Sequence, residues 1–240
     1  MLDKFKASGL HLLISAIIII SFLLLVYFVW YPYPLYEIEG LSQVTIILFA
    51  VDLILGPLLT LILYKKGKKY LFLDLSIIIT IQISAFAYGA VTITNSRPVY
   101  IVFAVDRFNT ISQTMIDINT LEDKSLKYSL FSQPIYIYTA PPNDPQESNN
   151  LLMSVLSGGK DIEQLPQYYQ PYLNNIALVK ARALTYTQKN KKYLDSIIRS
   201  NQNQYLLKDI SVLPLFGKNK EVLAVISSNG KVIDYINTHF

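Results

Sequence analysis

Three long apolar runs in the first 96 residues restrict what this chain can become. The run over residues 9–31 contains no Asp, Glu, Lys or Arg and ends in the aromatic-rich segment 27–31. About 20 apolar residues cross the hydrocarbon core of a bilayer, and Trp and Tyr gather at its interfaces. Residues 42–64 and 71–94 form two further runs of similar length. We therefore expect a transmembrane domain of three helices over residues 1–96.

A cleaved signal peptide is the alternative interpretation of the first run. The apolar region of a signal peptide spans only about 7–15 residues and ends in small residues at the cleavage site. The run here is longer, and Trp30-Tyr31-Pro32-Tyr33-Pro34 stands at its end. We therefore favour a retained transmembrane helix.

The lysines predict which side of the membrane each loop occupies. The only Lys or Arg residues before Arg97 are Lys4, Lys6 and the four lysines within residues 65–69. The 31–41 loop carries two glutamates instead. Short loops rich in Lys and Arg remain cytoplasmic. This pattern predicts a multi-pass protein with a cytoplasmic N-terminus. Residues 97–240 then form an outer domain, which in a double-membraned bacterium is anchored in the inner membrane and faces the periplasm.

Several polar residues lie inside the predicted spans. If the second and third spans form an antiparallel hairpin around Gly67, Asp52 lies at the depth of Gln82, and Thr60 at the depth of Asp74. An ionisable group in hydrocarbon costs at least about 2.5–3.5 kcal/mol and normally faces a partner. The two pairs can hold the hairpin together. Alternatively, Asp52 faces a groove that receives a cationic or polar group from a partner's transmembrane helix, or forms part of a proton or ion pathway.

Small and cyclic residues near these groups have structural and functional interpretations. Pro57, after Gly56, removes one backbone hydrogen bond and bends the second span, which is either an ordinary kink or a means of opening the surface at Asp52. Gly89 allows close packing of neighbouring helices or of a guest helix. Arg97 follows the third span directly and is expected to anchor the chain at the interface, with a partner contact as the alternative.

The remainder, residues 97–240, has the pattern of a small α+β domain. Tyr168 and Tyr169 lie in an aromatic, proline-marked segment, 165–172, which suits either core packing or a binding surface. Asn229-Gly230 between two β-rich runs is a strong hairpin signal. The expected strands are 99–108, 133–138, 212–216, 221–227 and 231–236, the expected helices are 149–157 and 189–202, and the clearest loop is 139–145.

The sequence offers little support for catalysis, cofactors or nucleic-acid binding. It contains no cysteine, and its two histidines, His11 and His239, lack metal-ligating neighbours at useful spacing. Phosphate-loop and nucleophile-elbow motifs are missing. The net charge of +4 is too small and too scattered for a nucleic-acid surface. We expect a protein that is not an enzyme and uses no metal or cofactor.

Several motifs, in order and spacing, resemble the TfpX/TfpZ family of type IV pilin accessory proteins. The likeness covers nearly the whole chain and is most specific over residues 30–108. The C-terminal Asn237-Thr238-His239-Phe240 departs from the family's expected Pro-Trp-like ending. The residues that carry the likeness are Trp30-Tyr31-Pro32, Asp52, Gly56-Pro57-Leu58-Leu59-Thr60, the basic turn 65–69, Asp74-Leu75, Gln82, Ala87-Tyr88-Gly89, Arg97-Pro98-Val99-Tyr100, Gln167-Tyr168-Tyr169, Leu213-Pro214-Leu215 and Ala224-Val225-Ile226.

The resemblance implies an inner-membrane factor that assists assembly of its cognate type IV major pilin. On this interpretation the spans, in contact with membrane lipid, shelter the pilin helix, while the outer domain recognises the pilin head. The alternative is a membrane-anchored regulator or sensor of the pilus assembly machinery that does not bind pilin directly. The candidate partner-binding residues are Asp52, Gly56, Pro57, Gln82, Gly89, Arg97, Tyr168 and Tyr169.

Overall fold

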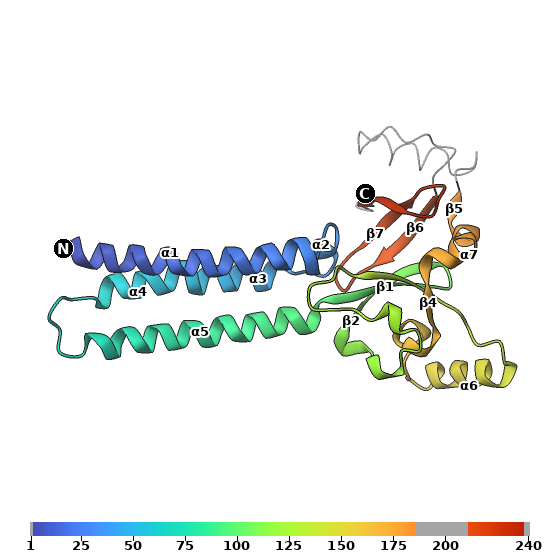
Figure 1. Ribbon diagram of the computed structural model, residues 1–240, viewed down its shortest axis with the longest axis horizontal. Helices are drawn as coiled ribbons and strands as arrows, with labels where there is room; N and C mark the ends of the chain where they lie inside the picture. The colour runs from blue at the N-terminus through green and yellow to red at the C-terminus, as the bar shows by residue number, and fades with distance from the viewer. Residues whose placement is uncertain (1, 186–210, 238–240) are drawn as a thin grey trace. The chain divides into compact units, whose positions relative to one another are not determined.

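The computed structural model describes residues 2–185 and 211–237 (Figure 1). The chain divides into two units. Unit 1 comprises residues 1–36 and 40–97, and unit 2 comprises residues 37–39 and 98–240. The predicted helix over residues 189–202 and His239 lie outside the described residues.

Unit 1 contains three helices that are long and apolar enough to cross a membrane, as the sequence predicted. The first is α1, Leu2–Leu25, which continues as the π-helical segment η1, Val26–Trp30. A short helix, α2 (Leu35–Ile38), follows. The second span consists of α3 (Ser42–Phe49), the π-helical segment η2 (Ala50–Leu55) and α4 (Gly56–Leu63), and the third is α5 (Leu71–Ser96).

The helices of unit 1 are tied together near Trp30. The Tyr31 hydroxyl donates to the Ile93 carbonyl of α5 at 3.0 Å, and both residues are buried. The rings of Phe22 and Phe86 meet edge to face with centroids 5.3 Å apart. Elsewhere α1 and α5 pack mainly on the second span, which lies between them (Figure 1). The first and third spans are therefore joined at one end and separated along much of their length.

Unit 2 is built on one mixed, eight-stranded sheet. The strand order is β4-β3-β1-β2-β6-β7-β8, with β5 paired to β6. The pairs β1–β3 and β2–β6 are parallel, and the others are antiparallel. The strands are β1 (Pro98–Ala104), β2 (Arg107–Ser112), β3 (Ile135–Thr139), β4 (Tyr169–Pro171), β5 (Leu184–Thr185), β6 (Ser211–Phe216), β7 (Glu221–Ile226) and β8 (Val232–Asn237). The expected α+β domain is confirmed.

The helices of unit 2 accompany this sheet. Short 3₁₀ turns connect β2 to β3, and longer helices follow β3 and β4. The helices are α6 (Pro145–Leu156) and α7 (Ile176–Arg182), and the 3₁₀ turns are Gln113–Met115, Ile118–Thr120, Lys124–Leu126, Ile162–Gln164, Pro166–Tyr168 and Tyr172–Asn175.

The predicted single strand over residues 99–108 is wrong, because the structure turns back within it. Val105 has φ 60°, and the Asp106 N–H donates to the Ala104 carbonyl at 2.8 Å, which closes a γ-turn. The chain then returns as β2, with Ala104 opposite Arg107. A β-branched residue at positive φ costs about 1–3 kcal/mol, so the residue types gave no signal of a turn here.

The predicted helix over residues 149–157 is present but begins earlier, as α6. The Asp144 carboxylate accepts from the Gln146 N–H at 3.2 Å, and Pro145 occupies the first turn, where its missing N–H costs nothing. The end was predicted correctly. Gly158 has φ +85°, and the Gly159 N–H donates to the Ser154 carbonyl at 2.8 Å, which is the pattern of a glycine-capped helix.

The core of unit 2 lies on both faces of β1, whose seven residues are all buried. On one face, the Tyr100 ring meets Tyr169 edge to face at 5.2 Å between centroids. A second group on unit 2 joins distant parts of the sheet. The rings of Phe108, Tyr136 and Tyr172 contact one another, and the hydroxyl of Tyr136 bonds to that of Tyr235 on β8. Because β3 and β8 stand near opposite ends of the strand order, the sheet must be strongly curled.

Residues 37–39, from the loop after the first span, are built into unit 2. The Ile38 side chain is fully buried, and its carbonyl accepts from the Asn219 N–H at 2.8 Å and the Lys220 N–H at 3.2 Å. A Cβ at Gly217 would lie only 2.6 Å from Ile38 Cγ1, so glycine is required for this approach. Burying one Ile side chain stabilises a fold by about 1.5–3 kcal/mol. This loop segment is therefore a structural part of unit 2.

Glu39 gives unit 2 a testable pH dependence. The Thr110 hydroxyl donates to its carboxylate, yet burial raises the pKa of Glu39 above its ordinary value, more than Thr110 and Lys218 lower it. When a carboxyl has a higher pKa in the folded state than in the unfolded state, its ionisation destabilises the folded protein. The protein therefore loses stability as the pH rises through the folded-state pKa. We expect Glu39→Gln to match the parent protein below about pH 4.5 and to have a higher melting temperature at pH 7.

Circular dichroism of the full chain in detergent, followed between pH 4 and pH 8, measures this difference. The exposed Glu122 supplies the control, because Glu122→Gln removes the same charge outside the core. A melting difference between Glu39→Gln and the parent that stays constant with pH would contradict the prediction.

Candidate functional site

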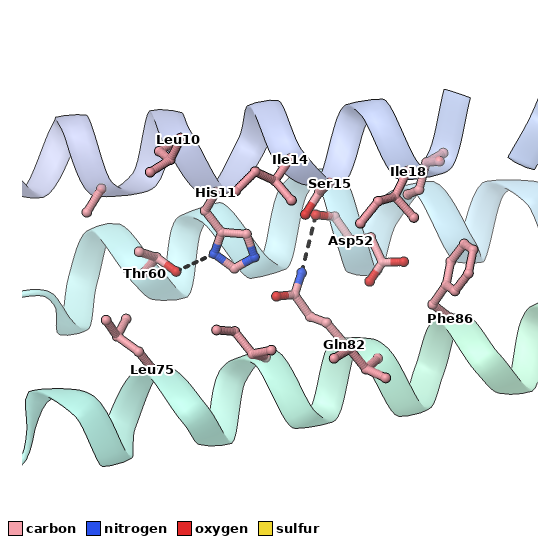
Figure 2. Close-up of a pocket in the computed structure, with 14 residues that line it drawn as sticks. Leu10, His11, Ile14, Ser15, Ile18, Asp52, Thr60, Leu75, Gln82 and Phe86 are labelled. Atoms are coloured by element: carbon pink, nitrogen blue, oxygen red, sulfur yellow. Dashed lines mark hydrogen bonds between the residues drawn. The ribbon is translucent and has the colours of Figure 1, made fainter. Parts of the chain in front are cut away.

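A groove of about 480 Å³ runs along unit 1 between α1 and α5, with the second span as its floor (Figure 2). On α1 it extends from Ala7 to Ile19, which is about 18 Å at 1.5 Å per residue. It ends where Phe86 meets Phe22. The lining residues are Ala7, Leu10, His11, Ile14, Ser15, Ile18, Ile19, Asp52, Thr60, Leu75, Ile79, Gln82, Ile83 and Phe86.

The walls of the groove are apolar and its floor is polar. Leu10 and Ile14 on α1, and Ile83 on α5, expose half or more of their surface. Asp52, Thr60 and Gln82 are buried at the base, with 5%, 3% and 9% exposed. Since the helices span a membrane, the exposed walls face lipid chains. A molecule entering sideways would meet apolar side chains first and polar groups only when fully seated.

Part of the polarity of the floor arises from the backbone, because Pro57 interrupts the hydrogen bonds of the second span. In η2 the Gly56 N–H donates to the Val51 carbonyl, five residues back. The Asp52 carbonyl would bond to the N–H of residue 57 in the same pattern, but proline has none. A free carbonyl in hydrocarbon costs several kcal/mol. Single π-helical turns of this kind occur often at functional sites.

Gln82 of α5 satisfies the carbonyl that Pro57 leaves free. Its side-chain Nε2 donates to the Asp52 carbonyl at 3.3 Å (Figure 2). Gly56 makes room for this amide, because a Cβ there would lie 2.5 Å from the Gln82 side-chain carbonyl carbon and closer still to Nε2. The predicted meeting of Asp52 and Gln82 therefore takes place through the Asp52 backbone. The two residues lie close together because they have equal depth in the hairpin. Gln82 binds the carbonyl rather than the carboxyl because Pro57 leaves that carbonyl without a backbone donor.

The Asp52 carboxyl lies in the groove with one of its oxygens buried. Among the described residues, no donor lies within hydrogen-bond distance of its buried Oδ1. Figure 2 places Asp52 on the floor, between the Ile18 and Phe86 walls. A buried carboxyl without a donor is costly whether ionised or protonated. The groove therefore contains a buried acceptor, Asp52 Oδ1, that the described residues leave without a donor.

The predicted pair of Thr60 and Asp74 is not present. Thr60 Oγ1 lies 2.7 Å from His11 Nδ1 of α1, and the Asp74 carboxylate lies 2.5 Å from the Lys68 ammonium. Asp74 stands in the first turn of α5, close enough to the basic turn to pair with lysine. Sequence reasoning missed His11 as a groove residue. Its position inside an otherwise apolar run was the available signal.

Two other candidate residues of unit 1 serve the bundle itself. A Cβ at Gly89 would lie 2.7 Å from Leu48 Cδ1, so Gly89 admits a side chain from the second span. Arg97 is buried, and its guanidinium lies 5.1 Å from the centre of the Trp30 ring. This packing against Trp30 leaves little of Arg97 for a partner.

The two tyrosines of unit 2 have different environments. Tyr169 is buried, and its hydroxyl donates to the Glu163 carbonyl at 2.5 Å, so it belongs to the core rather than to a binding surface. Tyr168 is half-buried, and its hydroxyl donates to Glu147 of α6 at 2.8 Å. Within the described ranges, no three His, Cys, Asp or Glu side chains gather where they could hold a metal ion.

These features define the class of the protein: a membrane protein with a three-helix bundle that carries a lateral groove, and a separate mixed-sheet unit. Residues 1–40 match the family model of the fimbrial assembly protein FimB. A relative from Dichelobacter nodosus, the fimbrial assembly protein of serogroups C1 and C2, is 40% identical over 110 residues, which cover 45% of this chain and 84% of the relative. The chain belongs to this family of fimbrial assembly proteins.

Two longer relatives from the same organism extend the similarity along the chain. The fimbrial assembly proteins of serogroups I and E1 are 29% and 28% identical over 235 residues, which cover 93% of this chain and 91% of each relative. The similarity therefore includes both units. No solved structure matches the chain.

The contact between Gly56 and Gln82 predicts a specific cost for a small substitution. We expect Gly56→Ala to destabilise unit 1 by about 1–3 kcal/mol, because the new Cβ displaces Gln82 and leaves the Asp52 carbonyl unbonded. In a Gln82→Ala background the same substitution should cost less, since the steric conflict is gone. Unfolding of the purified protein in mixed detergent micelles gives both values.

Gly9→Ala is the matched control for this comparison. A Cβ at Gly9 has nothing within 4 Å, and alanine favours a helix over glycine by about 1 kcal/mol. The interpretation fails if Gly56→Ala and Gly9→Ala have equal effects.

Proposed function

We propose that this protein assists fimbrial assembly by holding the transmembrane helix of a fimbrial subunit in the groove of unit 1. The observation that carries the proposal is the buried Asp52 carboxyl, whose Oδ1 lacks a donor among the described residues. The names of the relatives, all fimbrial assembly proteins, supply the biological context.

The groove restricts the chemistry of its occupant. Walls such as Ile14 and Ile83, exposed to lipid, suit an apolar helix. The polar groups inside the groove, Asp52 on its floor and His11 on α1, suit an occupant that carries one polar or cationic donor at matching depth. Because a donor inside hydrocarbon is itself costly, burying it against Asp52 favours the complex over both separated partners. A free amino-terminus at the end of a subunit helix is a donor of this kind.

The finer identity that we propose is a type IV pilin accessory protein of the TfpX/TfpZ kind, dedicated to its cognate major pilin. Unit 1 would shelter the pilin helix and unit 2 would recognise the pilin head. Such a protein acts by binding and needs no catalytic group. Recovery of pilus-machine components without pilin would instead favour regulation of the machinery.

For localisation, we propose the inner membrane, with the N-terminus in the cytoplasm and unit 2 in the periplasm. The lysines near the N-terminus and in the 65–69 turn support this orientation through the positive-inside rule. Residues 37–39 constrain the number of spans that precede the sheet rather than the direction of insertion. They are part of unit 2, so the loop after the first span and the sheet must share one side of the membrane.

Asp52→Asn tests the proposed function. The amide keeps the size of the side chain but removes its negative charge, and truncating one partner of a buried charged hydrogen bond costs about 2–5 kcal/mol. We expect at least about a tenfold loss of pilin that co-purifies with the tagged protein in mild detergent, and weaker piliation, at an unchanged level of the protein. Mass spectrometry of the purified complex measures the pilin recovered.

Asp74→Asn is the matched control, because Asp74 also lies in a span but already pairs with Lys68. It should leave the recovery of pilin unchanged. If Asp52→Asn recovers as much pilin as the parent protein, the assignment of Asp52 is wrong. If the parent protein itself recovers no pilin, the proposed function is wrong.

A further inference from the structure

A pocket of about 520 Å³ opens in unit 2 at the γ-turn between β1 and β2. Its floor contains Phe103, Thr139 and Ile162, all buried or nearly so. The Phe103 and Tyr138 rings stack on one wall, with centroids 6.0 Å apart and planes inclined by 14°. The Thr139 hydroxyl donates to the Phe103 carbonyl at 2.9 Å, so the polar side chain of the floor already has a hydrogen bond within the protein. This pocket therefore offers mainly apolar contact.

The rim of the pocket exposes two apolar side chains. Val105 is 72% exposed and Leu178 of α7 is 53% exposed. Val105 also occupies φ 60°, a conformation that glycine adopts freely and a β-branched residue adopts only under strain. A residue that is both strained and exposed contributes little to the stability of its own fold. Strained backbone positions of this kind cluster at binding and active sites.

One charged group, Arg182, lines the pocket beside these apolar residues. Arg182 is exposed, and none of the ion pairs found among the described residues involves it. The nearby Asp106 is engaged by Arg107 at 3.1 Å. The pocket is therefore apolar inside and cationic at one edge. Its complement is an apolar side chain with a carboxylate next to it, which Arg182 can bind through two parallel hydrogen bonds.

We propose that this pocket is a docking site for a polypeptide partner that inserts a large apolar side chain between Val105 and Leu178 and pairs an adjacent Asp or Glu with Arg182. The volume lies within the range of about 300–1,000 Å³ that is usual for ligand pockets. The few residues that carry most of the binding energy in protein interfaces are enriched in Trp, Tyr and Arg and lie in well-packed pockets. The proposal requires nothing of the groove in unit 1.

Site-specific photocrosslinking in the native host tests the proposal on the full chain. The photoreactive residue p-benzoylphenylalanine replaces Leu178 in one variant and Met153, an exposed residue of α6, in the control. We expect an adduct from position 178 and not from position 153. Sequencing of the crosslinked peptide should place an Asp or Glu within about four residues of the attachment point, the reach of one helical turn.

Charge reversal then tests the role of Arg182. Arg182→Glu should reduce the adduct about tenfold or more, and changing the partner's acidic residue to lysine should restore it. An adduct with a second copy of this chain or with residues 186–210 of the same chain would overturn the proposal. So would an adduct whose yield Arg182→Glu leaves unchanged. This readout is separate from the recovery of pilin with Asp52→Asn, so failure of either proposal can be recognised by itself.

Val105→Gly separates a docking role from a structural one. Glycine relieves the strain at positive φ, so we expect the melting temperature of the protein to rise by about 2–4 °C. The crosslinking yield at position 178 should fall severalfold, because the inserted side chain loses one wall. A merely structural Val105 would leave the yield unchanged, and that result would remove Val105 from the site.

Discussion

The groove of unit 1 depends on a hydrogen bond that Pro57 cannot make. In water the missing N–H would cost little, since solvent can bond the carbonyl left free, but lipid offers no donor. The Gln82 side chain replaces the missing bond at the Asp52 carbonyl, and it reaches that atom only because Gly56 has no side chain. Pro57, Gly56 and Gln82 therefore act together on one backbone carbonyl. Their contact places α5 against the second span at this depth. The Asp52 carboxyl is left for other use.

Much of the fold could be predicted because membrane spans and hairpins have strong local signals. Long apolar runs located the three helices, and Asn229-Gly230 located the turn between β7 and β8. The strand at 99–108 was misjudged because Val105 is a good strand former that tertiary structure holds in a turn. The inclusion of Ile38 in the sheet unit could not be foreseen, since that contact joins residues about 180 positions apart.

The candidate site was predictable in part for similar reasons. Depth in a hairpin brought Asp52 and Gln82 together, but depth cannot choose between a carboxyl and a carbonyl as the acceptor. Thr60 and Asp74 do not pair with each other: Thr60 contacts His11, and Asp74 pairs with Lys68. A groove at Asp52 was one of the alternatives that the sequence offered, but the residues that form its walls could not be assigned. In an all-apolar helix, residues that face lipid and residues that face protein have the same composition, because lipid is as apolar as leucine.

The sheet unit is discontinuous in the chain, and this has a consequence for its biogenesis. Ile38 leaves the ribosome well before the β6–β7 turn that hydrogen-bonds to it, and two membrane spans are synthesised in between. The sheet can therefore be completed only after the third span has been inserted and the C-terminal strands have been synthesised. A fragment that begins at residue 98 would lack one of its own core side chains. Completion of the sheet thus requires that the two spans between Ile38 and residue 98 return the chain to the side of the membrane on which it left the first span.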